Sequence, residues 1–264
     1  DRVSIWSING RLKISFVCHN TKYIPYVKGE ADLVYKKNKF YLFQTVDVPE
    51  NNIKDIESFI GVDFGIVNLA FTSDGDSFSG KEVNHTRKKA TKFKRKLQKK
   101  GTKNAKHKLK KYSGKERRFK KHINHVISKR IVNIALKTRR GIALEDLKGF
   151  KPTVRKAQQE TFRKWAFYEL RKFIEYKAKL LGIPVFFVDP KYTSQTCSVC
   201  GFVSKSNRKS QSLFSCKSCG KTLNADLNAA RNIGRLAVVN LPSLISVHAP
   251  ILNVPPLGTE NPVL

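Results

Sequence analysis

The chain has 264 residues, and its 52 Lys and Arg against 20 Asp and Glu give a formal net charge of +32. A charge of this size opposes compaction unless a polyanion neutralises it, which indicates a nucleic-acid partner rather than a merely soluble basic surface. The chain contains no stretch of about 18 apolar residues, which excludes a transmembrane helix and gives no reason to expect a membrane partner.

The N-terminal segment is predicted to form two β-hairpins. In "SIWSINGRLKISFV", two β-favourable runs flank Asn9-Gly10, which predicts a hairpin with a type I′ turn at these two residues. In "ADLVYKKNKFYLFQTV", a second hairpin is predicted to turn near Lys37-Asn38. Aromatic and basic residues alternate in both hairpins.

The next two segments contrast in charge. Residues 58–80, "SFIGVDFGIVNLAFTSDGDSFSG", predict an antiparallel meander of three strands. Residues 86–130 hold 21 Lys or Arg and a single acid, Glu116. The first half of this basic segment has little apolar periodicity and is interpreted as a solvated basic helix or a partly disordered arm. Its second half has apolar residues at helical spacing, which predicts a long helix with one apolar and one cationic face.

The remaining elements alternate between strand and helix. "RRGIALEDL" at 139–147 predicts a short strand, and residues 160–181 predict an amphipathic helix that Gly182 ends. "IPVFFVDP" predicts a buried strand, and a final helix is predicted to begin after the N-cap Asn224. The proline-rich tail at 241–264 is expected to be extended or disordered.

Four of the five cysteines have the spacing of a metal site. Cys197-x-x-Cys200 and Cys216-x-x-Cys219 each precede a glycine, which suits two tight turns around one tetrahedral zinc. All four positions are filled by protein, so we expect one structural zinc per chain. The alternatives are disulfides or free buried thiols, and no secretory leader favours disulfides.

Three separated acids form the second pattern. Asp63 interrupts an apolar strand, Glu145 ends the strand "IALEDL", and Asp226 opens the last helix. A carboxylate in a buried strand is costly unless it is paired, and carboxylates bind Mg²⁺ together with phosphate oxygens. Two such metals can activate water and stabilise the leaving oxygen of a phosphodiester. Taken singly, each acid also fits a turn, an ion pair with arginine or a favourable helix N-terminus.

The order of the elements makes the three acids more specific as a set. The order β-β-β-α-β-α-β-(cysteine insert)-α is the RNase H-like α/β layout, which brings the first strand, the fourth strand and the last helix to one edge. We therefore predict a β-rich segment and linker over 1–57, a nuclease core over 58–190 with a basic helical insert at 86–130, a zinc ribbon over 191–223, the last core helix over 224–240 and the tail over 241–264.

The linked motifs resemble a known family. "IGVDFGIVNLA", "IALEDLKG", "YTSQTCSVCG", "CKSCG" and "ADLNAARNI" occur in this order and are similar to those of TnpB (OrfB), a family of insertion-sequence proteins related to type V CRISPR effectors. The resemblance covers residues 58–237, and residues 1–50 are similar in character to the β-barrel wedge of the family. The chain begins at Asp1 and contains no Met, so we expect an N-terminally truncated fragment.

The resemblance implies a RuvC-type, RNA-guided DNA endonuclease associated with a transposable element. It implies that Asp63, Glu145 and Asp226 are catalytic and hold two Mg²⁺ or Mn²⁺ ions. It also implies guide RNA and target DNA as partners, with no small-molecule substrate, and a cytoplasmic, nucleoid-associated protein of a prokaryote. The basic segment 86–130 could neutralise phosphates of the RNA or of an RNA–DNA duplex, or could be a solvated helix face. The lysines selected for phosphate contact are Lys92, Lys96, Lys99 and Lys103.

One departure from the family pattern leaves alternatives open. Many members have Arg immediately before the third acid, where this chain has Ala225, and a missing guanidinium would weaken phosphate contact there. A catalytically idle, RNA-guided DNA-binding protein is therefore the leading alternative. A zinc-ribbon RNA-binding protein, such as a ribosomal component, is a third reading in which the three acids coincide by accident.

Overall fold

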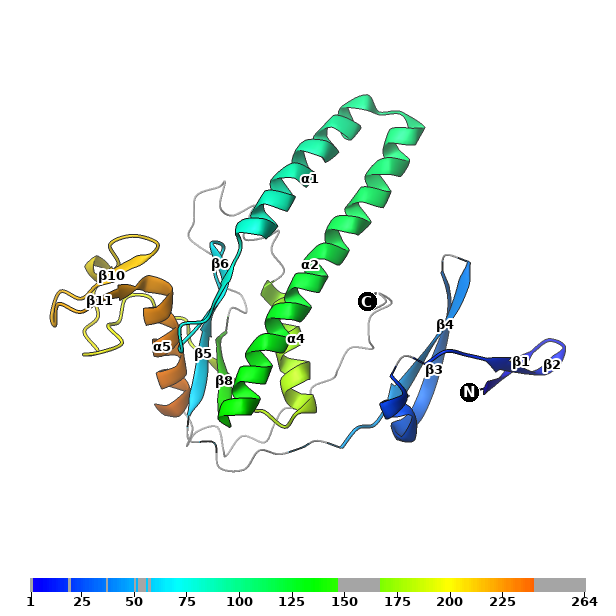
Figure 1. Cartoon of the computed structure of the whole chain (residues 1–264), viewed down its shortest axis with the longest axis horizontal. Helices are drawn as coiled ribbons and strands as arrows, with labels where there is room; N and C mark the ends of the chain where they lie inside the picture. Colours follow the sequence, from blue (N-terminus) through cyan, green and yellow to red (C-terminus); the bar gives the residue numbers. More distant parts are fainter. Residues whose placement is uncertain are drawn as a thin grey trace. The chain divides into compact units, whose positions relative to one another are not determined.

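The computed structural model of the chain describes residues 2–239 except 19, 37, 50, 52–55, 57 and 147–166. It divides into two compact units, Asp1–Glu50 and Asn51–Leu264 (Figure 1). The finer division into an insert, a ribbon and a tail stays a prediction. The predicted proline-rich tail and most of the predicted linker lie outside the described residues.

The first unit contains two separate two-stranded antiparallel sheets. Its elements are β1 (Arg2–Ser7), β2 (Gly10–Ser15), the 3₁₀ helix η1 (Thr21–Tyr26), β3 (Val27–Lys36) and β4 (Lys39–Val46). Among the described residues no strand of one hairpin pairs with the other, so the barrel expected here is not closed. Two hairpins without further pairing leave edges open, and a closed barrel needs every edge strand paired.

The turn of the first hairpin differs from the prediction. Ser7 pairs with Gly10, so the two-residue loop is Ile8-Asn9 and not Asn9-Gly10. Gly10 has a φ of +95°, whereas Asn9 is not among the residues with positive φ, which rules out a type I′ turn at Asn9-Gly10. The second hairpin turns where predicted, because Lys36 pairs with Lys39 across it.

The second unit is built on a five-stranded mixed sheet of order β7-β6-β5-β8-β9. Its strands are β5 (Phe59–Asp63), β6 (Asn68–Thr72), β7 (Ser77–Ser79), β8 (Gly141–Glu145) and β9 (Val185–Val188). The predicted three-stranded meander is confirmed, since β6 is antiparallel to both β5 and β7. β5, β8 and β9 are parallel to one another, so their carboxyl ends lie at the same edge.

The basic segment forms two helices, which we call the helical hairpin (81–138). They are α1 (Lys81–Lys100) and α2 (Lys103–Thr138), joined where Gly101 takes a φ of +64° and Thr102 accepts a hydrogen bond from the Ala105 N–H. Its first half is therefore helical and not a disordered arm. The apolar side chains that α1 buries are only three, seven residues apart, so they escape a search for helical periodicity: Val83, Ala90 and Leu97.

Helices cover both faces of the sheet. α2 and α4 (Phe167–Leu180) pack on one face against Ile60, Val62 and Leu144, and α5 (Ala225–Val239) packs on the other, as Figure 1 shows. Alternate side chains of a strand point to opposite faces, which accounts for this division. Gly61 allows α5 to lie close, because a Cβ there would be 1.8 Å from the Ala230 carbonyl oxygen.

The cysteine-rich segment lies between β9 and α5. It contains a single 3₁₀ turn, η2 (Lys205–Asn207), and one small antiparallel sheet of β10 (Leu213–Ser215) and β11 (Thr222–Asn224). β11 runs directly into α5, so the segment is tied at both ends to the mixed sheet and its helix. No helix in the described part of the chain is long and apolar enough to cross a membrane.

Candidate functional site

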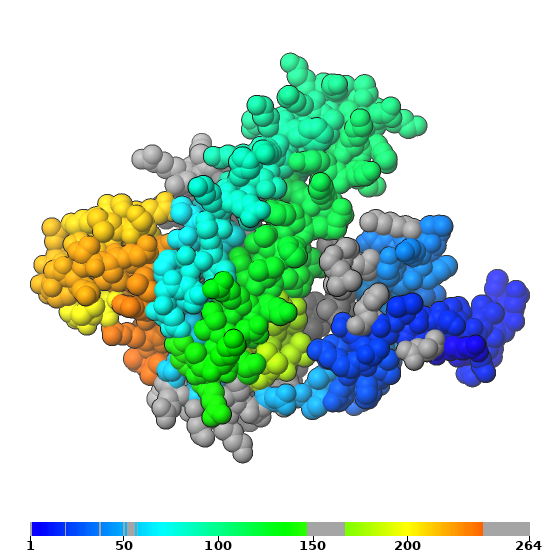
Figure 2. Space-filling model, viewed as in Figure 1, coloured from blue at the N-terminus to red at the C-terminus, as the bar shows by residue number. Residues whose placement is uncertain are grey.

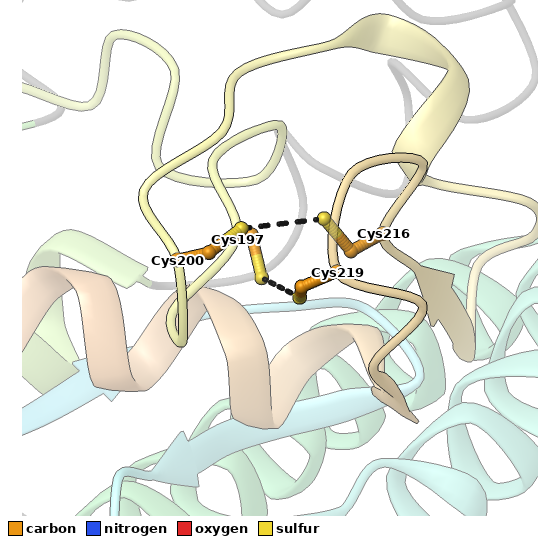
Figure 3. Close-up of side chains that lie close together, drawn as sticks. All are labelled: Cys197, Cys200, Cys216 and Cys219. Carbon is orange, nitrogen blue, oxygen red and sulfur yellow. Dashed lines mark hydrogen bonds between the residues drawn. The ribbon is translucent and has the colours of Figure 1, made fainter.

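The four predicted cysteines lie together (Figure 3), and we call them the four-cysteine site. Their sulfurs all lie within 4.8 Å of one another; Cys197 and Cys216 are buried, whereas Cys200 and Cys219 are exposed. The Sγ atoms of Cys197 and Cys219 are 3.8 Å apart, and those of Cys200 and Cys216 are 3.6 Å apart. A tetrahedron with Zn–S bonds of about 2.3 Å needs sulfurs roughly 3.8 Å apart, so the arrangement can hold a metal such as zinc.

Each cysteine pair closes a tight turn of its own. The Gly201 N–H donates to the Cys197 carbonyl at 2.9 Å, and the Gly220 N–H donates to the Cys216 carbonyl at 3.2 Å. Both glycines have positive φ, +77° and +71°. The backbone N–H of Cys219 directed at the Cys216 sulfur lowers the pKa of Cys216 to about 6. A thiolate is the form that ligates metal, so this N–H favours metal binding by Cys216. Against the lowering effect of the Lys221 backbone N–H, the neighbouring cysteine sulfurs raise the pKa of Cys219 to about 11.

The three predicted acids are brought to one edge of the sheet, and we call them the carboxylate cluster. Asp63 is the last residue of β5, Glu145 is the last residue of its parallel neighbour β8, and Asp226 is in the first turn of α5. The register pairs Val62 with Leu144, so the two strand-end acids are neighbours. The Asn224 side chain caps α5 by accepting hydrogen bonds from two N–H groups of the first turn, as predicted.

The carboxylates influence one another electrostatically. Burial raises the pKa of Asp63 well above its usual value, and the charges of Glu145 and Asp226 raise it further. Burial also raises the pKa of Glu145, against the lowering effects of the Thr193 hydroxyl and of Arg208. Like charges that raise a pKa in a partly buried site are a mark of functional carboxylates, because the site is relieved by a bound cation.

Polar neighbours orient two of these acids. The Asn68 side-chain amide donates to Asp226 Oδ2 at 2.8 Å, and the Thr193 hydroxyl donates to Glu145 Oε1 at 2.6 Å. Among the described residues, only the four cysteines form a group tight enough to hold a metal as they stand. The carboxylates therefore lie near one another without being closed around a ligand position.

Arg208 is a site residue that the sequence analysis missed. It lies between the two cysteine pairs, and its Nη2 is 3.8 Å from Asp226 Oδ1. Its charge lowers the pKa of both Asp63 and Glu145. Nothing in the sequence separates Arg208 from the many other basic residues of a chain with 52 Lys and Arg. Ala225, where a guanidinium was expected, is buried against the four-cysteine site, so the guanidinium beside the last acid comes from Arg208.

The predicted phosphate-binding lysines are not near the carboxylate cluster. All four are exposed, and they lie toward the connection between α1 and α2: Lys92, Lys96, Lys99 and Lys103. That end of the helical hairpin projects from the rest of the second unit, as the blue-green and green surface at the top of Figure 2 shows. These lysines can contact a ligand only at a distance from the three acids.

Comparison with known proteins finds two matching family models and several similar proteins. Residues 43–153 match the family model described as a probable transposase, and residues 167–233 match the Cas12f1-like TNB domain. TnpB-like protein MJ0751 of Methanocaldococcus jannaschii is 33% identical over 231 residues, which cover 85% of this chain and 78% of that protein. Putative RNA-guided DNA endonuclease InsQ of Escherichia coli is 28% identical, covering 81% and 58%.

The chain is also similar to CRISPR-associated effectors. The endodeoxyribonuclease Cas12f1 of Sulfoacidibacillus thermotolerans is 32% identical, covering 80% of this chain and 53% of that protein. A solved Cas12f1–sgRNA–target DNA complex superposes with a TM-score of 0.54 at 25% identity, covering 77% of this chain and 55% of that one. The chain thus spans about half the length of the Cas12f1 relatives it matches. The match to MJ0751 extends over most of both proteins, and the chain belongs to the TnpB family.

Proposed function

We propose that the chain is the nuclease part of an RNA-guided, divalent-metal-dependent DNA endonuclease associated with an insertion element. Relatives named as RNA-guided DNA endonuclease and as CRISPR-associated endodeoxyribonuclease support the activity. The likeness to a complex of Cas12f1 with sgRNA and target DNA supports guide RNA and target DNA as partners. The net charge of +32 is consistent with polyanionic partners.

The proposed fold of the second unit is an RNase H-like, RuvC-type nuclease domain. The strand order β7-β6-β5-β8-β9 supports this assignment, because β6 is the strand of this sheet that runs antiparallel to the central strand β5. So does α5, which packs against β5 and begins at the edge where β5 and β8 end. The cysteine-rich segment is then a zinc ribbon inserted before the last helix, and the first unit corresponds to the wedge.

The observation that carries the proposal is the convergence of Asp63, Glu145 and Asp226 from three elements onto one edge. Burial and mutual repulsion raise the pKa of Asp63, so a bound cation would stabilise the ionised form of the cluster. The donors are hard carboxylate oxygens, which suit Mg²⁺ or Mn²⁺. When bound, two such ions would activate water and stabilise the leaving oxygen of the phosphodiester.

The chain's own residues prepare this cluster. The Asn68 amide donates a hydrogen bond to Oδ2 of Asp226, and Oδ1 of the same carboxylate faces Arg208. The positive charge of Arg208 opposes the effect of burial and favours ionised Asp63 and Glu145, the forms that bind cations. A guanidinium beside the cluster can also pair with a phosphate oxygen, the role that the sequence left vacant at Ala225.

The other proposed roles follow from position. The four-cysteine site holds one structural zinc, because all four tetrahedral positions are filled by protein sulfurs. The exposed lysines of the helical hairpin, Lys92, Lys96, Lys99 and Lys103, contact phosphates of RNA or of an RNA–DNA duplex.

Parallel cleavage and binding assays with Asp63→Ala test this proposal. The protein is supplied with RNA transcribed from the end of its own element and with a matching DNA target. We expect the substitution to abolish cutting while RNA-dependent DNA binding persists, because the basic surface is untouched. Asp76→Asn is the matched control, since Asp76 pairs with Arg130 away from the cluster. Equal cleavage by Asp63→Ala and the unaltered protein would refute the role of Asp63. Firm binding without any cleavage by the unaltered protein would establish the idle-binder alternative.

A further inference from the structure

A hydroxyl from the cysteine-rich segment contacts the carboxylate cluster directly. Thr193, only 4% exposed, lies four residues before Cys197, and its Oγ1 is 2.6 Å from Glu145 Oε1. The same Oγ1 is 3.0 Å from the Pro190 carbonyl, but a hydroxyl has one proton to donate. An ionised carboxylate is the stronger acceptor, so the proton is directed at Glu145.

Two buried asparagines of α5 hold the backbone that carries this hydroxyl. Asn232 donates to the carbonyls of Thr193 at 2.8 Å and Thr196 at 2.7 Å. Asn228 donates to the Thr196 carbonyl at 2.8 Å and accepts from the Ser198 N–H at 2.9 Å. These are the two asparagines of the "ADLNAARNI" motif, four residues apart on one face of the helix. Leaving such buried amides unpaired is costly, so the segment is fixed on α5.

The same short segment carries the first turn of the four-cysteine site. The Cys197 N–H donates to the Phe202 carbonyl at 2.9 Å. The next residue, Ser198, is the one whose N–H donates to Asn228. At its other end, Tyr192 has a φ of +65°, a strained conformation for a residue other than glycine. The segment from Tyr192 to Ser198 is therefore held in one conformation, with a sulfur ligand near one end and the Glu145 contact near the other.

We propose that Thr193 is a positioning residue for Glu145, held in place by Asn228 and Asn232, so that the four-cysteine site supports the carboxylate cluster. This inference rests on the function proposed above. By occupying Oε1, the hydroxyl fixes the orientation of the carboxylate and leaves Oε2 for a divalent ion. Because the first turn of the same α5 carries Asp226, one helix sets the relative placement of Glu145 and Asp226.

The test measures Mn²⁺ affinity of the zinc-loaded full chain by calorimetry. Thr193→Val keeps the shape of the side chain but removes the hydroxyl, and we expect its Kd for Mn²⁺ to rise about tenfold or more. Thr193→Ser restores the hydroxyl and should restore the affinity. The matched control is Thr196→Val in the same turn, whose hydroxyl donates to the Tyr192 carbonyl at 2.9 Å. Zinc content should stay at one per chain in all three variants. Cleavage by Thr193→Val should recover as Mn²⁺ is raised, which a general loss of structure would not allow.

The outcomes separate this inference from the proposed function. If Asp63→Ala loses Mn²⁺ binding and Thr193→Val retains full affinity, the positioning role is wrong and the catalytic site stands. If Thr196→Val weakens Mn²⁺ as much as Thr193→Val does, the effect is a loosening of the turn and the specific role is wrong. If the unaltered chain binds no Mn²⁺, or Asp63→Ala binds it equally well, the proposed metal site fails and the positioning role fails with it.

Discussion

The four-cysteine site and the carboxylate cluster both adjoin the first turn of α5, yet they are built in opposite ways. Each cysteine pair lies within a five-residue turn that closes through its own backbone, and the sulfurs are already within 4.8 Å of one another. The three acids come from two strands and a helix far apart in the chain, and they are not closed around a ligand. Short turns can therefore prepare a closed structural site, whereas the edge of the sheet assembles an open one.

The two sites also differ in the pKa values of their side chains. A backbone N–H lowers the pKa of Cys216 to about 6, so this one thiol is prepared to ligate metal, whereas the pKa of Cys219 is raised to about 11. Burial and neighbouring charges instead raise the pKa of Asp63. An acid whose ionised form is disfavoured gains more from an incoming cation, which suits a site that binds metal together with substrate phosphate.

Removing one charge from the open site should give the largest effect on activity. We expect Glu145→Gln to lower the rate of RNA-guided cleavage roughly 10³-fold or more, because the amide keeps the shape of the side chain but loses its charge. Glu116→Gln is the control, since Glu116 pairs with Lys94 and Lys120 in the helical hairpin. Single-turnover cleavage rates give the readout, and comparable losses in both variants would contradict the account.

Removing one ligand from the closed site should mainly affect stability. Cys200→Ser should lower zinc content and, because metal binding contributes to folding, lower Tm by roughly 10 °C. Cys18→Ser is the control, as Cys18 lies in the first unit and outside the four-cysteine site. Metal analysis and thermal melts measure both quantities. A well-folded chain with no zinc would show that the cysteines have another role.

The exposed lysines of the helical hairpin should act on affinity without acting on chemistry. Neutralising Lys92, Lys96, Lys99 and Lys103 together should make the dependence of log K on log salt shallower by up to about 3.6, if each contacts one duplex phosphate. Changing all four to Arg keeps the charge and should keep the slope. An unchanged slope after neutralisation, measured by RNA-binding titrations, would assign these lysines to a solvated face.

The smallest effect is expected on the other face of the sheet, between α2 and α4. His125 stacks on Phe173 with ring centroids 4.0 Å apart, and burial together with the charge of Lys177 lowers its pKa from 6.5 to about 4. Above pH 6.5 the ring is neutral in both states, whereas below it the unfolded chain takes up the proton first, so stability falls between pH 6.5 and 4. Since the ring is only half-buried, we expect a loss of about 1 kcal/mol at most.

Urea unfolding at pH 7 and pH 5 measures this loss. His125→Phe keeps an aromatic ring against Phe173 without a titrating group, so it should show a smaller change between the two pH values. Equal pH dependence of the His125 variant and the unaltered chain would contradict the lowered pKa of His125.

Lys177 should affect stability at alkaline pH. Burial lowers its pKa from 10.5 to about 8, so the free energy of unfolding should rise as pH increases from 8 to 10.5.

The features that local sequence could predict were those set by neighbouring residues. The cysteine turns depend on Cys-x-x-Cys-Gly, and β5 and β8 are apolar runs that end in an acid. The contact of Arg208 with Asp226 and that of Thr193 with Glu145 could not be predicted, because both depend on how the cysteine-rich segment docks on α5. The region of α1 could be read from sequence as a solvated helix or as a disordered arm, because its three buried side chains are too sparse to give a periodic signal.

Counting bound metals shows whether the carboxylate cluster is a divalent-metal site separate from the four-cysteine site. The zinc-loaded chain is dialysed against Mn²⁺, and both metals are counted for the unaltered protein and for Asp63→Ala. We expect one zinc in both, with Mn²⁺ bound in addition only by the unaltered protein. Equal Mn²⁺ in the two proteins, or Mn²⁺ that only displaces zinc, would contradict this expectation.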